Sequence, residues 1–373
     1  MSTKILILSA DAGKSYRTAA ETVAEQFSRM NIVADIADAL TLVPENSATL
    51  TGWKGSYSYH VLSRRDGNAY RTEALRAGKK LYRLCALGAS ALGTLLKEGA
   101  YDAVLCIHVY AGMMMTELRR RGVLNVPFCF LATEYTGEPG INEVEADGYC
   151  IPHRMLAGDF IRYDIPADRL FPTGIPIPPR FSPGHADRAS LRREAGLPEK
   201  GRLVLVRAGN FEHPRAASRI LALRDVLPDD TFLAVLCGIN DRLLHQLTQC
   251  RNRERLFPFG YDVAPEKLLL ASDICVGKPR GVATAEAMSC GIPLILFREM
   301  RGAESKNLDF LVRNGAADGS RSWGEILRAV PDLLARPEEL ARRSTAVRSF
   351  LPANAAEQVC RTVIRARTPG FPS

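Results

Sequence analysis

The chain has 373 residues, with 49 lysines and arginines against 41 aspartates and glutamates, a net charge of +8 and 46% apolar residues. This length exceeds one ordinary domain and suffices for two hydrophobic cores. A charged fraction of 24% and a mean hydropathy of -0.07 exclude a disordered chain, whose few apolar residues could not offset the entropy of folding. No stretch approaches the roughly 18 consecutive apolar residues that a membrane-spanning helix needs, so we expect neither a span nor a signal peptide.

Residues 1–172 are predicted to form an α/β domain, because strand-like segments alternate with helical ones as in a parallel sheet covered on both faces. The predicted strands are Lys4–Ser9, Ile32–Ala37, Ala103–Ile107, Val126–Ala132 and Asp147–Ile151, and the predicted helices are Tyr16–Met30 and a segment near Pro152–Ile161. Residues 173–185 are dense in proline and glycine, which suit neither a helix nor a central strand. We interpret them as a linker.

Residues 186–350 repeat the alternation and predict a second α/β domain. Its predicted strands are Arg202–Arg207, Thr231–Leu236, Leu256–Phe259, Ile274–Gly277 and Pro293–Phe297, and its predicted helices are Arg215–Val226, Arg242–Arg251, Pro265–Ala271 and Thr284–Cys290. Residues 351–373 are predicted to be a helix or tail that packs back on the N-terminal domain. Ligands bind at the carboxyl edge of such sheets, so we expect the functional residues there.

The nine cysteines are scattered through apolar runs without CxxC spacing. This pattern favours reduced, buried thiols over a zinc site or a disulfide framework. We therefore expect a cytoplasmic protein.

The segment from Trp53 to Arg83 carries six of the eight net positive charges, with eight basic residues against two acidic ones. Tyrosines and Trp53 are interleaved with the basic residues, a combination that suits a membrane interface. Three interpretations stay open: a solvated amphipathic face, a surface for anionic lipid headgroups, or a nucleic-acid surface, for which no recognition motif is present. The candidate membrane and acceptor residues are Trp53, Lys54, Arg64, Arg65, Arg71, Lys79 and Lys80.

Two strand-to-helix turns are candidate phosphate sites. Gly13, Lys14 and Ser15 follow the first strand, but Leu8 stands where a P-loop needs its first glycine. Such a turn can still present backbone N–H groups to an anion, or be a plain connection. The second turn, Lys278–Gly281, precedes a helix predicted to begin near Thr284, with Glu286 in its first turn. Helix N–H groups would face a diphosphate there, and the carboxylate could accept hydrogen bonds from ribose hydroxyls.

The block from Phe259 to Ala317 resembles the monogalactosyldiacylglycerol synthase and processive diacylglycerol glucosyltransferase family, which is related to the N-acetylglucosaminyltransferase that acts on lipid I. That family has a Lys-Pro-Gly-Gly turn, a glutamate on the next helix, Pro-Gly-Gln-Glu and an asparagine. The corresponding residues here are Lys278-Pro279-Arg280-Gly281, Glu286, Arg301-Gly302-Ala303-Glu304 and Asn307. Further matches, at Asp147–Pro152, Thr173–Pro176, Cys237–Asn240 and Gly260-Tyr261, extend the resemblance over nearly the whole chain.

The resemblance implies a GT-B fold: two Rossmann-like domains, with a UDP-sugar held mainly by the C-terminal domain and an acceptor by the N-terminal one. It implies metal-independent, inverting transfer of a hexose to a lipid hydroxyl at the cytosolic membrane face, with no cofactor. Glu286 would bind the ribose, Lys278–Gly281 and Thr284 would surround the diphosphate, and Glu304 would hold sugar hydroxyls. The full set of implied donor-site residues is Gly209, Asn210, Gly238, Asn240, Tyr261, Lys278, Arg280, Gly281, Thr284, Glu286, Gly302, Ala303, Glu304 and Asn307.

The chain departs from the family at catalytic positions. Tyr16 and Glu138 stand where the family has histidines, and Ala303 replaces the glutamine. Tyrosine is a poor base at neutral pH. The candidate catalytic residues are Tyr16, His108 and Glu134, and of these His108 and Glu134, which follow two successive strands, are the candidate bases. Two alternatives stay open: a purely structural role for His108, and simple solvation in the loop for Glu134 and Glu138. Two other functions stay open: a catalytically impaired nucleotide- or partner-binding protein, or a glycosyltransferase with a non-lipid acceptor.

Overall fold

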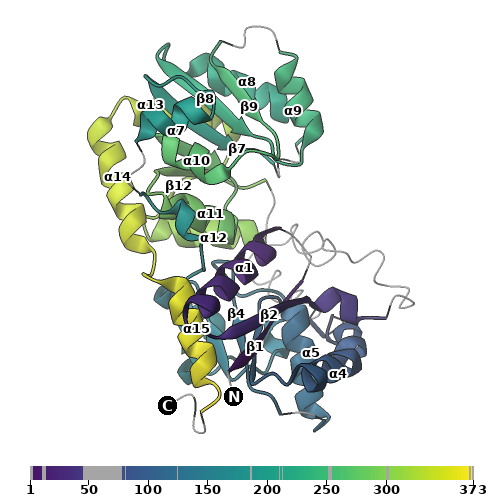
Figure 1. Cartoon of the computed structure of the whole chain (residues 1–373). Coiled ribbons are helices and arrows are strands. Elements are labelled where there is room, and N and C mark those ends of the chain that lie inside the picture. Colours follow the sequence, from purple (N-terminus) through teal and green to yellow (C-terminus); the bar gives the residue numbers. More distant parts are fainter. Residues whose placement is uncertain are drawn as a thin grey trace. The chain divides into compact units, whose positions relative to one another are not determined.

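The computed structural model describes residues 3–10, 14–44, 78–79, 81–123, 125–184, 187–209, 211, 213–250, 254–299, 302–368 and 371, with only the backbone at position 14. The chain divides into two compact units. The first comprises residues 1–178, 301–303 and 352–373, and the second comprises residues 179–300 and 304–351. Each unit is a parallel sheet covered by helices (Figure 1).

The sheet of the first unit has six strands in the order β2-β1-β3-β4-β5-β6, and every neighbouring pair is parallel. The strands are β1 (Lys4–Ser9), β2 (Val33–Asp38), β3 (Ala103–Cys106), β4 (Phe128–Leu131), β5 (Gly148–Cys150) and β6 (Leu170–Phe171). From β1 the chain first adds β2 on one side and then returns to add β3 and the later strands on the other side, so the direction of strand addition reverses between β1 and β3. The carboxyl ends of these two neighbouring strands therefore flank the point where open α/β sheets bind ligands.

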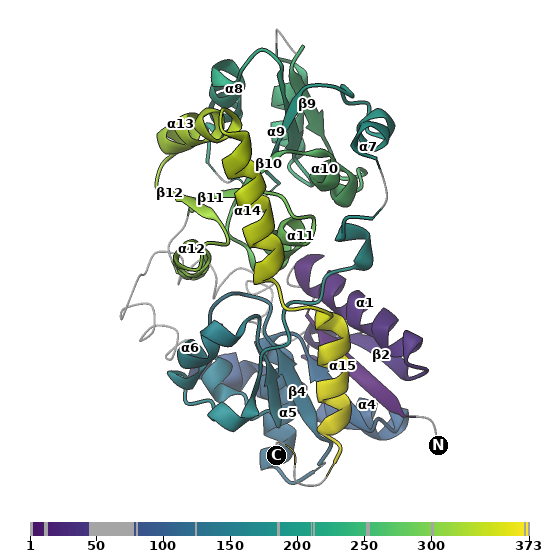
Figure 2. The same ribbon diagram turned by 90° about the vertical axis from the view of Figure 1, so that its left-hand side faces the viewer.

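The helices of the first unit are α1 (Lys14–Arg29), α4 (Ala89–Gly99), α5 (Val109–Arg120), α6 (Ala157–Ile161) and α15 (Ala355–Arg365), with short 3₁₀ helices at Ala39–Leu42, Ala86–Gly88, Ile141–Glu143, Arg154–Leu156 and Ala167–Arg169. The predicted helix near Pro152–Ile161 is only a 3₁₀ turn followed by α6, because His153 caps the turn after Pro152. The last helix of the chain, α15, packs on α1 and on β3, β4 and β5 (Figure 2).

The sheet of the second unit has the order β12-β11-β10-β7-β8-β9, again with every neighbouring pair parallel. The strands are β7 (Arg202–Arg207), β8 (Thr231–Leu236), β9 (Leu256–Phe259), β10 (Ile274–Gly277), β11 (Leu294–Phe297) and β12 (Asp318–Ser320). Here the order of connection reverses between β7 and β10. The predicted turn Lys278–Gly281 follows β10, at this reversal point.

The helices of the second unit are α7 (Arg188–Glu194), α8 (Ala216–Val226), α9 (Asp241–Thr248), α10 (Pro265–Ala271), α11 (Gly281–Ser289), α12 (Ala303–Arg313), α13 (Trp323–Leu334) and α14 (Pro337–Phe350), with a 3₁₀ turn at Pro179–Phe181. The prediction that α11 begins near Thr284 is wrong. Arg280 is extended and caps a helix that starts at Gly281, and the Thr284 N–H donates to the Arg280 carbonyl. Glu286 therefore lies in the second turn of α11, not the first.

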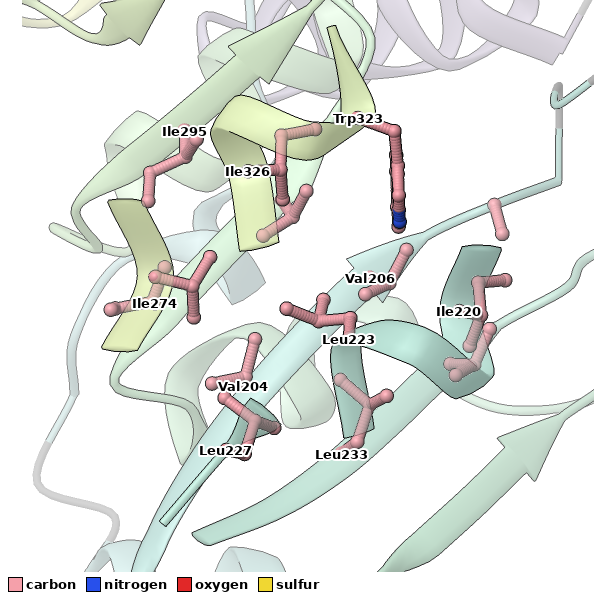
Figure 3. Packing of buried hydrophobic residues seen from close by; sticks show 14 of the residues in the cluster. Val204, Val206, Ile220, Leu223, Leu227, Leu233, Ile274, Ile295, Trp323 and Ile326 are labelled. Carbon is pink, nitrogen blue, oxygen red and sulfur yellow. The ribbon is translucent and has the colours of Figure 1, made fainter. Parts of the chain in front are cut away.

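The core of the second unit forms between the sheet and the helices α8 and α13 (Figure 3). Val204 and Val206 of β7 meet Leu223 of α8 and Ile326 of α13, all with no exposed surface. The Trp323 indole N–H donates to the Arg219 carbonyl at 2.7 Å, which ties α13 to α8. This packing makes the carboxyl ends of the strands a rigid platform.

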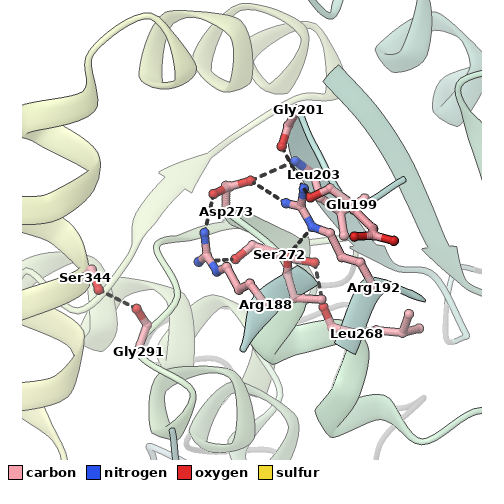
Figure 4. Close-up of polar contacts among 11 residues, drawn as sticks. Arg188, Arg192, Glu199, Gly201, Leu203, Leu268, Ser272, Asp273, Gly291 and Ser344 are labelled. Carbon is pink, nitrogen blue, oxygen red and sulfur yellow. Dashed lines mark hydrogen bonds and ion pairs between the residues drawn. The ribbon is translucent and has the colours of Figure 1, made fainter. Parts of the chain in front are cut away.

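The opposite, amino edge of the second sheet is fixed by partly buried polar contacts around Asp273 (Figure 4). Its carboxylate accepts hydrogen bonds from Arg188 at 2.6 Å, Arg192 at 3.2 Å and the Leu203 N–H at 2.8 Å. Arg192 also donates to the carbonyl of Gly201 at 2.7 Å. These bonds connect α7 to the starts of β7 and β10, so they are structural.

Eight of the nine cysteines are buried and Cys250 is half-buried, and all nine are free thiols, as expected. Among the described residues, no helix is both long enough and apolar enough to cross a membrane.

Candidate functional site

The turn after β10 carries the first candidate residues. Gly277 ends the strand, Lys278 and Pro279 follow, and Arg280 caps α11. The Asn307 side chain donates to the Pro279 carbonyl at 2.8 Å, so α12 holds the turn in place. Lys278 is buried even though lysine is a residue that usually faces water.

Two carboxylates explain why Lys278 is buried. Its Nζ lies 2.9 Å from Glu299 Oε2 and 3.8 Å from Glu304 Oε1. Glu304 is only 1% exposed, also lies 3.8 Å from Arg280 Nε, and accepts a hydrogen bond from the Glu299 N–H. Arg219 of α8 lies 3.7 Å from the other oxygen of Glu299. Buried charges persist when they are paired in this way, and the arrangement places two acids and three cations at one sheet edge.

Glu286 of α11 is paired with Arg207, the last residue of β7. Arg207 Nη2 donates to Glu286 Oε2 at 2.7 Å, while Nη1 donates to the carbonyl of Ala283 at 2.6 Å. Burial lowers the pKa of Arg207, but the Glu286 carboxylate outweighs this effect and the net shift is upward. Arg207 therefore stays charged, and its guanidinium fixes the orientation of the Glu286 carboxylate.

The ends of β7 and β8 approach closely. A Cβ added to Gly209 would lie 3.2 Å from the Cys237 carbonyl and 3.7 Å from the Cα of Gly238, which has a φ of +55°. Asn240 caps α9, because its side chain accepts a hydrogen bond from the Leu243 N–H. Tyr261 lies beyond β9 and is exposed. The structure thus brings Gly209 and Gly238 together, whereas Asn240 has a capping role of its own.

Other predicted donor-site residues lie on α11 and at the start of α12. Gly281 and Thr284 are buried in the first turn of α11, and the Thr284 hydroxyl has no hydrogen-bond partner among the residues that the structure describes. Gly302 has a φ of +77° and directly precedes α12, which Ala303 opens. His213 follows β7 and accepts a hydrogen bond from the Arg215 N–H.

In the first unit, His108 and Tyr16 contact each other. Their ring centroids are 4.8 Å apart in an edge-on arrangement, and the Tyr110 ring lies 4.1 Å from His108. His108 caps α5 by accepting a hydrogen bond from the Tyr110 N–H at its Nδ1. Burial lowers the pKa of His108 to about 3. His108 is therefore neutral at pH 7, with its ring proton on Nε2, and this nitrogen can donate but cannot accept a proton.

Glu134 and Glu138 lie in the loop that follows β4, the neighbour of β3. Glu134 is half-buried and Glu138 is only 7% exposed, so the interpretation of Glu138 as a solvated loop residue is wrong. The loop is compact because its glycines pack against other side chains. On the other side of the sheet reversal, Ser15 is exposed at the start of α1.

Several predicted residues lie outside the described part of the chain: Gly13, Trp53, Lys54, Arg64, Arg65, Arg71, Lys80, Asn210 and the side chain of Lys14. Lys79 is described and exposed. Its neighbour Gly78 packs against Gly140, since a Cβ at position 78 would lie 2.9 Å from the Gly140 Cα. One end of the Trp53–Arg83 segment therefore lies beside the loop that carries Glu134 and Glu138.

This chain is similar to known enzymes that are named for the glycosylation of diacylglycerol. The family model for monogalactosyldiacylglycerol (MGDG) synthase matches residues 16–177. The processive diacylglycerol beta-glucosyltransferase of Bacillus subtilis (strain 168) is 23% identical over 372 residues, which are 97% of this chain and 95% of that protein. The enzyme of the same name from Bacillus cytotoxicus is 25% identical over 93% of this chain and 89% of its own.

Solved structures agree on the fold. MurG of Acinetobacter baumannii has a TM-score of 0.60 at 15% identity, covering 98% of this chain and 100% of its own. The co-structure of S. aureus MnaA with UDP has a TM-score of 0.67 at 12% identity, and the match covers 97% of this chain and 96% of that one. The chain has the GT-B fold. The predicted resemblance and fold class are confirmed.

Three residues at this edge of the second sheet were not predicted from the sequence: Arg207, Glu299 and Arg219. Each pairs with a charged partner from a distant part of the chain. The sequence does hint at Arg207 and Glu299, because each is a charged residue at the carboxyl end of a buried strand or shortly after it. Arg219 lies within α8 and offers no comparable sign.

Proposed function

We propose that this protein is a glycosyltransferase that transfers a hexose from a UDP-sugar to a hydroxyl of a diacylglycerol-like lipid. The observation that carries the proposal is the arrangement of Lys278, Glu286 and Glu304 at one edge of the second sheet, at the reversal point between β7 and β10. The near full-length similarity to diacylglycerol glucosyltransferases supports the acceptor, and the fold shared with a UDP-bound protein supports the donor.

In the proposed donor site, backbone N–H groups at the start of α11 and the cations Lys278 and Arg280 surround the diphosphate. A helix N-terminus and fixed cations stabilise the charge that grows on a departing diphosphate. Glu286, held by Arg207, accepts hydrogen bonds from the ribose hydroxyls. Glu304 accepts them from the sugar.

The proposed reaction inverts the anomeric centre, because the acceptor oxygen attacks from the face opposite the departing diphosphate. It needs a group that removes the acceptor proton and donors that stabilise the diphosphate, and positioning supplies much of the rate. We propose that it proceeds without a metal or cofactor, since protein cations are available for the diphosphate.

The proposed place of action is the cytosolic face of a membrane. The Trp53–Arg83 segment is strongly basic, and each lysine or arginine near an anionic surface contributes on the order of 1 kcal/mol to binding. Gly78, in this segment, packs beside the loop that follows β4. A lipid bound by the segment would therefore lie near the candidate catalytic groups of the first unit.

The test is incubation of the full chain with UDP-glucose, UDP-galactose or UDP-N-acetylglucosamine and vesicles that contain diacylglycerol, followed by detection of UDP and glycolipid. We expect both products with at least one donor. UDP release only with a soluble acceptor would redirect the proposal to a non-lipid substrate. UDP binding without any transfer would favour the catalytically impaired protein.

A further inference from the structure

The carboxylate of Glu138 is buried in the loop that follows β4, although glutamate is usually exposed to water. It is 7% exposed, and its Oε1 has no hydrogen-bond partner among the residues described. Burying a polar atom without a partner destabilises a fold, so such an atom calls for a functional explanation. Among the contacts of the first unit's described residues, none supplies that reason.

The loop around Glu138 is built to hold it still. Asp159 Oδ2 accepts hydrogen bonds at 3.1 Å from both the Thr136 hydroxyl and the Gly137 N–H. Gly137 lies against the Tyr163 ring, where an added Cβ would come within 2.5 Å of a ring carbon. The Ile141 N–H donates to the Glu138 carbonyl at 3.1 Å. The backbone on both sides of Glu138 is thus anchored, as a reactive side chain requires.

The surroundings of this loop raise the proton affinity of the Glu138 carboxylate. Burial raises its pKa to about 8, the charge of Glu134 acts in the same direction, and a hydrogen bond from the Thr133 backbone opposes both. From the neighbouring α6 segment, Asp159 and Tyr163 face the loop at Thr136 and Gly137. A base with a pKa near the working pH combines availability with strength.

His108, the other candidate of this edge, is poorly suited to the same task. β3 and β4 are neighbours, so His108 and the Glu138 loop follow adjacent carboxyl ends. The Nδ1 of His108 is occupied by the Tyr110 N–H, and its Nε2 carries the proton. His108 can therefore donate a hydrogen bond to an acceptor oxygen, but another group must take the proton.

We propose that Glu138 is the catalytic base that removes the proton of the acceptor hydroxyl. This inference rests on the proposed function. In the step, the acceptor oxygen forms a bond to the anomeric carbon while the bond between that carbon and the β-phosphate oxygen breaks. The proton moves to the Glu138 carboxylate, and the electron pair of the broken bond leaves with UDP.

The experiment compares full-length wild type, Glu138→Gln, Glu138→His and the control Glu143→Gln from the same loop. It measures glucose transfer from UDP-glucose to dioleoylglycerol in phosphatidylglycerol vesicles between pH 6 and 9.5, and UDP affinity by calorimetry. Glutamine cannot take a proton, so we expect kcat/KM to fall on the order of 10² to 10⁴-fold with the UDP affinity unchanged. Histidine should restore part of the activity and move its pH dependence to lower pH.

In the wild type, kcat/KM should rise with pH up to an apparent pKa near 8, and Glu143→Gln should match it. A Glu138→Gln variant with at least a third of wild-type kcat/KM and an unchanged pH profile would overturn the inference while leaving the proposed function intact. A wild-type profile that is flat between pH 7 and 9 would also overturn it, even if the glutamine variant failed to fold. Absence of transfer by the wild type from UDP-glucose, UDP-galactose and UDP-N-acetylglucosamine alike would overturn both proposals.

Discussion

Arg207 at the end of β7 holds Glu286 of α11 through a hydrogen bond of 2.7 Å between Nη2 and Oε2. The two residues are 79 positions apart in the chain and meet only because β7 and β10 are neighbours in the sheet. The ion pair therefore joins the two sides of the reversal point at which the donor is proposed to bind.

Glu286→Ala should abolish the binding of UDP, because the ribose loses its acceptor and the partly buried Arg207 loses its carboxylate partner. Arg207→Met should weaken the binding and lower the free energy of unfolding by about 1 to 3 kcal/mol, since a partly buried pair loses one partner. Calorimetry with UDP and thermal unfolding separate these effects. Full retention of UDP binding by Glu286→Ala would refute the assignment of the ribose site.

Glu304→Gln should separate the contribution of the sugar to donor binding from that of the nucleotide. Glu304 is proposed to hold sugar hydroxyls, so this variant should bind UDP-glucose no more tightly than UDP, while its affinity for UDP stays within a few-fold of wild type. Lys278 keeps its closer partner Glu299 at 2.9 Å, which should preserve the turn. A loss of UDP and UDP-glucose binding in equal measure would instead indicate a structural role.

Glu138→Gln should stabilise the fold at neutral and higher pH. The folded-state pKa of Glu138 is raised to about 8 from a usual value of 4.5, so its ionisation in the unfolded chain costs stability progressively between these two values. The gain in unfolding free energy should be near zero at pH 4, reach about 4 kcal/mol at pH 8, and then level off. Denaturant titrations at several pH values measure it, and an equal effect at every pH would contradict the buried, protonated state.

Replacing the basic residues of the Trp53–Arg83 segment should weaken membrane binding. We expect less flotation with anionic vesicles for a variant with glutamine at Arg64, Arg65, Arg71, Lys79 and Lys80, and the wild type should dissociate as salt is added. A control variant removes five exposed arginines elsewhere: Arg154, Arg162, Arg242, Arg336 and Arg361. Equal flotation of the two variants would show that net charge alone, rather than this segment, governs binding.

The sequence predicts the strands better than the site. Apolar runs such as Arg202–Arg207 and Thr231–Leu236 mark buried parallel strands, and their bounds match β7 and β8. The start of α11 is missed because the extended conformation of Arg280 lets a helix begin at a glycine. The pairs Arg207–Glu286 and Lys278–Glu299 depend on strand order, which local patterns do not encode. The proton position on His108 likewise depends on its bond to the Tyr110 N–H.

The most direct test of the central claim is mass spectrometry of the lipids after the protein acts on UDP-[¹³C]glucose and diacylglycerol vesicles. The account predicts a labelled β-linked glycosyl-diacylglycerol in amounts equal to the UDP released, with both products lost in Glu286→Ala. Release of UDP and free labelled glucose without any labelled lipid would contradict it.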